Sequence, residues 1–265
     1  MQLLTNKSVL VTGGARRIGR AIAVALAHAG ADVAITYRTS HDDAAHTVAE
    51  IAALGRRSLA VECDVRSEPS VRSAIANVIA NFGRLDVLVN NAAVFASAAL
   101  ESLTLEQWDT IFETNSRGPF LVAREALPYL RAAHGRIVNI GSLGGLRAWP
   151  GHAHYCASKA ALHMLTQAMA KAFAPDVSVN CVAPGWIEME KESNEGGSPL
   201  PLPSPAAATE VERRVGSEAA RFAARTPMRR NGTADDVAQA VLFFAAGPDF
   251  ITGQTLAVDG GLGLV

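Results

Sequence analysis

The sequence predicts a three-layer, doubly wound α/β fold with a mainly parallel sheet of seven strands. Two observations predict it. Short apolar runs of strand type alternate with segments of helical periodicity along all 265 residues. The first unit reads as strand, glycine turn, helix and strand, which requires parallel strands joined by a right-handed crossover. Because no linker interrupts this alternation, we expect a single domain over residues 1–265.

The elements follow in order from the N-terminus. A strand over 7–12 precedes the glycine turn, a helix follows the turn and stops at Gly30, and a second strand covers 32–37. Further strands are expected at 57–63, 86–90, 136–140, 177–183 and 255–259, and helices at about 41–54, 67–82, 105–132, 153–173 and from 234 onward.

Two of these helices begin with the spacing of a capping box. Thr104 is followed by Gln107, and Thr233 by Asp236, three residues later in each case. In this arrangement the threonine side chain accepts a hydrogen bond from the backbone three residues on, and the later side chain returns one. Both positions are therefore expected helix starts.

The overall charge gives no sign of a polyanionic partner. The net charge is −1 and the isoelectric point is near 6.7, so neither a nucleic acid nor an anionic membrane surface is expected to bind. No apolar run approaches the ~18 residues of a membrane span, and the N-terminus leads directly into the first strand. We expect a cytoplasmic protein that acts on a small-molecule substrate.

The cysteines predict neither a disulfide framework nor a metal site. Cys63, Cys156 and Cys181 are odd in number and widely separated, with no C-x-x-C pair among them. His152 and His154 lack the helical spacing and the further ligands of a zinc site. No bound metal is expected.

The glycine turn after the first strand predicts a dinucleotide site. Residues 12–19 read TGGARRIG, between a strand and a helix. Glycines let the backbone approach a pyrophosphate, which then lies at the N-terminus of the helix, where N–H groups and the dipole favour anions. Arg16 and Arg17 add positive charge at this turn. In this context the turn indicates a Rossmann-type cofactor site.

The end of the second strand distinguishes between the two nicotinamide dinucleotides. An NAD site places a carboxylate about 20 residues after the glycines, against the ribose hydroxyls. Here the chain has Tyr37, Arg38 and Ser40 instead, while Asp32 stands too early, at the strand start. Arginine suits phosphate, and no carboxylate repels one. We therefore expect NADP(H) as the cofactor.

Residues 142–159 predict the reacting centre. Tyr155 and Lys159 stand four residues apart in a helical segment, so their side chains share one face. A nearby ammonium favours the phenolate and lowers the pKa of a tyrosine from about 10, towards the range useful for acid–base catalysis. Ser142 follows the strand at 136–140 and is expected to hydrogen-bond the same substrate oxygen.

Taken together, these motifs resemble the short-chain dehydrogenase/reductase family over essentially the whole chain. The matching segments are TGGARRIG at 12–19, Asp64–Val65, NNAA at 90–93, Asn115, Ser142, Tyr155, Lys159, PGW at 184–186 and ITGQTLAVDGG at 251–261. Within the family, TYRTS, AEIAALG and RTPMRRNGTADDVAQAV are similar to the 3-oxoacyl-carrier-protein reductases.

The resemblance implies a role for each matched residue. Tyr155 would donate the proton in reduction, Ser142 would polarise the carbonyl, and Lys159 would bind the nicotinamide ribose and lower the pKa of Tyr155. Asn115 would anchor a water in the proton relay. The implied cofactor contacts are Gly13, Arg16, Arg17, Ile18, Gly19, Tyr37, Arg38, Ser40, Asp64, Val65, Asn91, Ala92, Tyr155, Lys159, Pro184, Gly185 and Ile187. The expected reaction is NADPH-dependent reduction of a 3-oxoacyl thioester or a similar ketone.

One departure from the family pattern leaves an alternative substrate open. Arg17 replaces the middle glycine of T-G-x-x-x-G-x-G, as in the pteridine-reductase branch, and Phe95 matches the aromatic position on which that branch stacks a pterin. Ser142, however, stands where that branch has an aspartate. Reduction of a pterin or dihydrofolate is therefore one alternative, and a non-catalytic NADP(H)-binding protein is another.

The family also implies a substrate lid and an oligomer. The lid is expected at about 188–226, with a helix at about 206–224. The expected pocket walls are Phe95, Leu143, Trp149, His152, His154 and Trp186. The long apolar helices at about 105–132 and 153–173 are similar to those that pair across two-fold axes in the family, which implies a homotetramer.

Overall fold

Seven parallel strands form one sheet in the computed structural model, which describes residues 3–188 and 219–265. The strands are β1 (Ser8–Val11), β2 (Asp32–Tyr37), β3 (Ser58–Glu62), β4 (Val87–Asn90), β5 (Arg136–Ile140), β6 (Ser178–Pro184) and β7 (Thr255–Val258). Their order is β3-β2-β1-β4-β5-β6-β7, and each neighbouring pair is parallel. The predicted doubly wound fold is confirmed, with a sheet that is parallel throughout the described residues.

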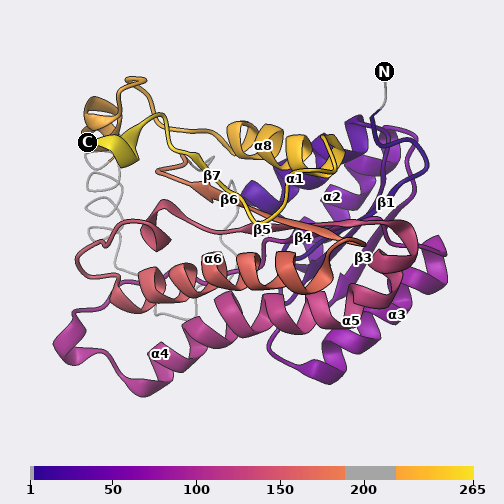
Figure 1. The fold of residues 1–265 in the computed structure, drawn as a ribbon, viewed down its shortest axis with the longest axis horizontal. Helices are drawn as coiled ribbons and strands as arrows, with labels where there is room; N and C mark the ends of the chain where they lie inside the picture. Colours follow the sequence, from indigo (N-terminus) through magenta and orange to yellow (C-terminus); the bar gives the residue numbers. More distant parts are fainter. Residues whose placement is uncertain (1–2, 189–218) are drawn as a thin grey trace.

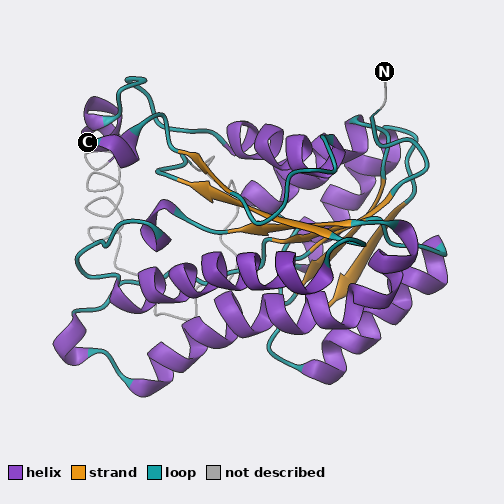
Figure 2. Ribbon diagram, in the orientation of Figure 1, coloured by secondary structure: helices purple, strands orange, loops and turns teal. Residues whose placement is uncertain are grey.

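Helices cover both faces of this sheet (Figures 1 and 2). They are α1 (Arg17–His28), α2 (His41–Ala53), α3 (Glu68–Phe82), α4 (Leu105–Phe112), α5 (Gly118–Ala133), α6 (Ala153–Phe173) and α8 (Ala234–Ala246). One apolar core packs α1, α2 and α8 against one face, and a second packs α3, α5 and α6 against the other. The strand order reverses between β1 and β4, and ligands of such sheets bind at the carboxyl ends of the strands near that point.

Both predicted capping boxes are present. The Thr104 side chain accepts from the Gln107 N–H and the Gln107 side chain accepts from the Thr104 N–H, at the start of α4. Thr233 and Asp236 make the same pair of bonds at the start of α8. These bonds satisfy N–H groups that a helix start leaves without partners, which explains why both boundaries fall where the sequence predicts them.

The segment expected as one helix over 105–132 is interrupted. It consists of α4, a π-helical turn over Glu113–Arg117, and α5. The π turn contains Asn115, and such turns occur frequently at functional sites. Apolar periodicity alone does not reveal this interruption, because the buried side chains continue on both sides of it.

A row of buried amides fixes the strands beneath the expected site. Asn90 on β4 donates to Asn139 on β5 across 2.9 Å, and Asn139 donates to the Thr166 hydroxyl on α6 at the same distance. The register pairs Asn90 with Asn139, and Asn139 with Cys181 on β6. These hydrogen bonds between buried groups join the carboxyl ends of β4 and β5 to each other and to α6.

None of the helices in the described ranges combines the length and apolarity that crossing a membrane requires. The three cysteines are buried and free. Within residues 3–188 and 219–265, no three histidine, cysteine or acidic side chains gather in a way that would hold a metal ion.

Candidate active site

Tyr155 and Lys159 project from the first turns of α6, as their spacing predicts. The Lys159 ammonium nitrogen lies 5.9 Å from the centroid of the Tyr155 ring. Lys159 is only 3% exposed, and its Nζ donates a hydrogen bond of 2.8 Å to the Ile140 carbonyl at the end of β5. The amino group is therefore fixed between the helix and the sheet, close to the phenol.

Ser142 lies near Tyr155 as well, in the loop that follows β5. It caps the short 3-10 turn Leu143–Gly145, where its Oγ accepts from the Gly144 N–H across 3.0 Å. A hydrogen bond between the Ser142 side chain and Tyr155 favours the phenolate. The structure thus brings together Ser142, Tyr155 and Lys159, three residues expected to be catalytic.

The pKa values of this group differ from the sequence-based expectation. Burial raises the pKa of Tyr155, and the hydrogen bond with Ser142 opposes that rise only in part. Burial likewise lowers the pKa of Lys159 to about 8, while the nearby Cys181 thiol acts in the opposite direction. The net shift of the tyrosine pKa is therefore opposite to the expected lowering, because desolvation is the larger effect.

Asn115 joins the loop after β4 to α6. Its side chain is completely buried; Oδ1 accepts from the Val94 N–H (2.8 Å), and Nδ2 donates to the Val94 carbonyl (2.9 Å) and to the Ser158 hydroxyl (3.1 Å). Ser158 in turn donates to the Tyr155 carbonyl across 2.8 Å. These contacts connect Asn115 to the backbone of the catalytic helix, while its role in a proton relay stays a prediction.

The glycine turn is built by contacts between backbone segments. Gly13 has a φ of +62°, which a glycine adopts without strain. A Cβ on Gly19 would lie 2.1 Å from the Gly13 carbonyl oxygen, so no other residue fits there. Asn91 donates to the Thr12 and Gly13 carbonyls at 3.0 and 2.9 Å, which fixes the turn from the side of β4. Ala92 packs against Gly13 beside it.

The start of α1 fits an anionic ligand. Within the described part of the chain, no side chain caps its N-terminus and its first turn has no acidic residue. Arg16 occupies the N-cap position, and Arg17 and Ile18 follow. Arg17 has a φ of +53°, a left-handed conformation that is uncommon for residues other than glycine. Backbone strain of this kind gathers at functional sites, and here it lies at the expected pyrophosphate position.

Positive charge surrounds the expected adenosine end. Arg38 and Ser40 follow Tyr37 at the end of β2, with Arg38 exposed. The Arg66 guanidinium holds the Asp64 carboxylate, with Nη2 2.6 Å from Oδ2, and this bond is the main cause that lowers the pKa of Asp64; Arg38 contributes in the same direction.

The Asp64–Arg66 pair is not among the sequence predictions, although a single residue separates the two in the chain. Val65, between them, is buried, and its side chain lies directly beside Gly118. A charged pair at the i, i+2 spacing of a loop has no periodicity that would reveal it. The arrangement nevertheless places two arginines around a carboxylate expected to face adenine.

The two ends of the expected lid are attached to the body of the protein. Pro184 ends β6, and the Gly185 N–H donates to the Val258 carbonyl on β7. Ile187 forms an isolated parallel bridge with Gly232, and the Trp186 ring stacks on Phe222, with centroids 4.2 Å apart. Residues 219–225 are helical, whereas 189–218, which include most of the expected lid and the start of its helix, lie outside the described residues.

Aromatic rings surround the phenol on its open side. Phe95 meets Tyr155 edge-on with centroids 4.8 Å apart, and Trp149 lies nearly parallel to Tyr155 at 6.3 Å. His152 stacks on Phe95 at 4.8 Å and hydrogen-bonds Ser97 across 2.8 Å. Phe95 is 58% exposed, so this wall faces solvent and is open to a ligand.

Two of the expected pocket residues lie deeper. Leu143 is buried, and a Cβ on Gly263 would contact its methyl group. His154 is buried with both ring nitrogens lacking a hydrogen-bond partner among the described residues. Its pKa is lowered mainly by burial and further by the neighbouring His152. Leu143 and His154 are therefore not part of the exposed aromatic wall.

Sequence comparisons agree with this geometry. The chain matches the family model described as Enoyl-(Acyl carrier protein) reductase over residues 13–263. It is 36% identical to the 3-oxoacyl-[acyl-carrier-protein] reductase FabG of Staphylococcus aureus (strain N315) over 260 residues, which covers 97% of this chain and 98% of the relative. It is 36% identical to the 3-oxoacyl-[acyl-carrier-protein] reductase of Synechocystis sp. over 266 residues, covering 99% of each.

A solved structure has the same architecture. A short chain dehydrogenase from Burkholderia cenocepacia J2315, in complex with NADP, superposes with a TM-score of 0.82 at 38% identity, with 98% of each chain covered. The chain therefore belongs to the short-chain dehydrogenase/reductase family and is an oxidoreductase of that family, similar to FabG reductases over nearly its full length.

Proposed function

We propose that the protein is an NADPH-dependent carbonyl reductase whose substrate is a 3-oxoacyl thioester or a similar small ketone. The observation that carries the proposal is the meeting of Ser142, Tyr155 and Lys159 at the carboxyl end of β5. A hydroxyl, a phenol and an ammonium in this arrangement suit the protonation of one substrate oxygen. The 3-oxoacyl-carrier-protein reductases at 36% identity support this substrate class.

In this proposal each side chain acts at a defined atom. The Ser142 hydroxyl holds the carbonyl oxygen, and the Tyr155 phenol donates a proton to that oxygen. Lys159 binds the nicotinamide ribose and, as a cation close to the phenol, supports the phenolate that remains. The hydride chemistry belongs to the bound nicotinamide. The start of α1, whose first turn has no acidic residue, and the tight Gly13 turn would hold the pyrophosphate of the cofactor.

NADP(H) is the proposed cofactor because of the charges at the end of β2. The exposed Arg38 lies close enough to Asp64 to lower the pKa of its carboxyl group. Arg38 and Ser40 would bind the 2′-phosphate, and Asp64 and Val65 would contact adenine. The Burkholderia structure at 38% identity is a complex with NADP, which supports the same choice.

A pterin is the alternative substrate that a specific observation favours. Phe95 presents a largely exposed ring in edge contact with Tyr155, and Arg17 replaces a family glycine at the cofactor turn. Ser142 at the position of the branch's aspartate opposes this alternative. A non-catalytic NADP(H)-binding role is disfavoured, because such a protein has no need of an assembled serine, tyrosine and lysine.

NADPH oxidation tests the proposal directly. The purified protein is given an acetoacetyl thioester or dihydrobiopterin, with Tyr155→Phe as the control variant. We expect turnover with the thioester and a loss of at least about 100-fold in kcat in the variant, the scale of an acid–base group. Preference for dihydrobiopterin would favour the pterin alternative. Unchanged turnover by the variant would exclude Tyr155 as the acid.

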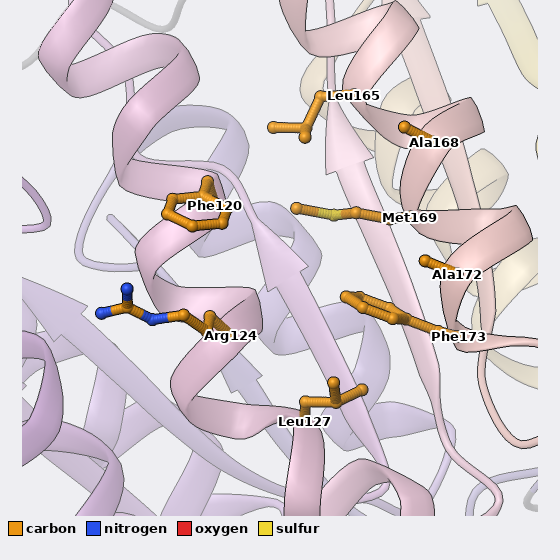
Figure 3. Close-up of a pocket in the computed structure, with 8 residues that line it drawn as sticks. All are labelled: Phe120, Arg124, Leu127, Leu165, Ala168, Met169, Ala172 and Phe173. Atoms are coloured by element: carbon orange, nitrogen blue, oxygen red, sulfur yellow. The ribbon is translucent and has the colours of Figure 1, made fainter.

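A homotetramer is proposed from the surface of α5 and α6. A groove of about 240 Å³ lies between these helices and is lined almost entirely by apolar side chains (Figure 3). Its residues are Phe120, Arg124, Leu127, Leu165, Ala168, Met169, Ala172 and Phe173. Two copies that pair these faces across a two-fold axis would cover the groove in both and form a dimer, and two such dimers would make the tetramer that the family resemblance implies. We further propose one domain over residues 1–265 and a cytoplasmic location.

A further inference from the structure

His163 lies one helical turn beyond Lys159 on the same face of α6. The Lys159 Nζ donates to the Ile140 carbonyl across 2.8 Å, and the His163 Nε2 accepts from the Ser142 N–H across 3.4 Å. These two bonds serve the backbone groups on either side of Gly141, at the point where the chain leaves β5. The side chains of one helix face therefore satisfy the end of the strand that presents Ser142.

The space for the imidazole comes from two glycines. A Cβ on Gly141 would lie 2.2 Å from His163 Nε2, and a Cβ on Gly145 would lie 2.7 Å from its Cε1. His163 is only 6% exposed. The ring thus occupies a closely fitted position between both ends of the loop 141–145, so its displacement would require the loop to move.

The hydrogen bond determines which nitrogen carries the proton. Since the Ser142 N–H is the donor, Nε2 is unprotonated and the proton is on Nδ1, which has no partner among the described residues. The titratable groups around the ring are Lys159 on α6 and Cys181 on β6. Burial, assisted by the charge of Lys159, lowers the pKa of His163 to about 4, so the ring is neutral at physiological pH.

We propose that His163 is a positioning residue of the reaction, which holds the Ser142 backbone through Nε2 and so places the Ser142 hydroxyl against the substrate oxygen. The orientation of that hydroxyl is set by the Gly144 N–H within the loop, and the loop is set by His163. The inference rests on the proposed role of Ser142. It assigns a function to a buried polar side chain that would otherwise be an unfavourable member of the core.

Two nearly isosteric variants separate positioning from packing. His163→Gln retains an acceptor at the end of a side chain of similar reach, whereas His163→Met fills similar space with a thioether, a weak acceptor at best. We expect kcat within about 3-fold of wild type for Gln and a loss of about 10- to 100-fold for Met, as for other small misplacements of catalytic groups. The KM for NADPH should change little in both. Equal losses in the two variants would overturn the proposal.

A double-mutant cycle tests whether His163 acts through Ser142. In a Ser142→Ala background the hydroxyl is already absent, so His163→Met should lower kcat by no more than about 3-fold further. An undiminished effect of the methionine in that background would show that His163 acts by another route, and would overturn the proposal.

A spectroscopic measurement on the wild-type protein does not depend on substrate or on the folding of a variant. In protein labelled with ¹⁵N-histidine, long-range proton–nitrogen correlation spectra should show His163 as the neutral form protonated on Nδ1, with Nε2 in a hydrogen bond. Protonation on Nε2 would overturn the proposal even in an active enzyme. If no ketone is reduced, the proposed function fails, while this measurement still decides whether His163 holds the Ser142 backbone.

Discussion

The buried ammonium of Lys159 has opposite effects on activity and on stability. Its pKa falls from 10.5 to about 8 in the folded protein, so the folded state binds fewer protons than the unfolded state between these values. At pH 7 the burial of the charge costs about 3 kcal/mol, at 1.36 kcal/mol for each pKa unit. This cost is absent above the unfolded pKa, so stability rises as the pH increases from about 8 to about 10.5.

Replacement of Lys159 by methionine should therefore abolish activity at little cost in stability. The variant removes the desolvation cost but leaves the Ile140 carbonyl without its donor, which costs about 1–3 kcal/mol. We expect the free energy of unfolding to change by less than about 2 kcal/mol while kcat falls by at least about 100-fold. Urea denaturation at pH 7 and NADPH oxidation measure the two. A large loss of stability would mean that the Ile140 bond outweighs the desolvation of the charge.

Arg38 is the residue that should set the choice of cofactor. Arg38→Asp places a carboxylate where the 2′-phosphate would lie, so we expect the KM for NADPH to rise by about 10- to 100-fold, the value of a few kcal/mol in charge interactions. The KM for NADH should improve. Arg38→Gln removes the attraction without adding repulsion, so its KM for NADPH should lie between those of the wild type and Arg38→Asp. Steady-state kinetics with both cofactors measure this, and unchanged NADPH preference in Arg38→Asp would place the phosphate elsewhere.

At the scale of single elements, the start of α1 combines strain with positive charge. Arg17 adopts a left-handed conformation that costs an ordinary residue about 1–2 kcal/mol. Arg17→Gly should be more stable than Arg17→Ala by about 1 kcal/mol, because both lose the guanidinium but only glycine relieves the strain, less its greater freedom when unfolded.

Both Arg17 variants should bind NADPH more weakly than wild type and to a similar degree. Cofactor fluorescence titration measures affinity, and thermal unfolding measures the difference in stability. Wild-type affinity in either variant would mean that the arginine serves no cofactor contact. Equal stability of the alanine and glycine variants would mean that the turn relaxes when the arginine is removed.

The elements also show how far sequence patterns extend. Period and capping chemistry are local properties, so they predicted the strands, the helix starts at Thr104 and Thr233, and the shared face of Tyr155 and Lys159. Burial depends on what the rest of the chain places nearby, and it raised the pKa of Tyr155 against expectation. The hydrogen bonds between Asn115 and the Val94 backbone likewise depend on a π turn that no apolar periodicity encodes.

At the scale of the whole molecule, buried histidine makes stability dependent on mildly acidic pH. A histidine titrates near 6.5 when unfolded, and the folded pKa of His163 is about 4, so the unfolded state binds more protons between these values. The contribution of His163 to the free energy of unfolding is fully present above about pH 6.5, and it decreases by up to about 3 kcal/mol as the pH falls to about 4. The lowered pKa of His154 acts in the same direction.

The paired carboxylates act in a different range. The pKa values of Asp64, Asp86 and Asp236 are lowered from 3.8, so their contributions are lost only below that value. Between pH 6.5 and 4, His163→Gln should therefore flatten the fall of the unfolding free energy relative to wild type, whereas the exposed control His46→Gln should not. Urea titrations across this range measure it, and equal slopes in all three proteins would contradict the assignment.

The proposed tetramer has a matching test on α6. Ala168→Glu places a carboxylate in the largely apolar groove between α5 and α6, and burial of a charge in an interface is costly. We expect the variant to dissociate into smaller species, as measured by light scattering after size-exclusion chromatography. Ala45→Glu on the exposed side of α2 is the control and should leave the assembly intact. A wild-type mass for Ala168→Glu would show that this groove is not an interface.

The π turn over Glu113–Arg117 sets the phase between two helices. A π turn accommodates one residue more than a regular helix would, and each residue rotates a helix by about 100°. Deletion of one residue there would join α4 and α5 into a regular helix, and it would rotate the two parts relative to each other by about the same angle. Asn115 could then face Val94 and Ser158 only if α5 turned its apolar side away from the sheet. The extra residue therefore allows α5 to pack its apolar side against the sheet while Asn115 faces Val94 and Ser158.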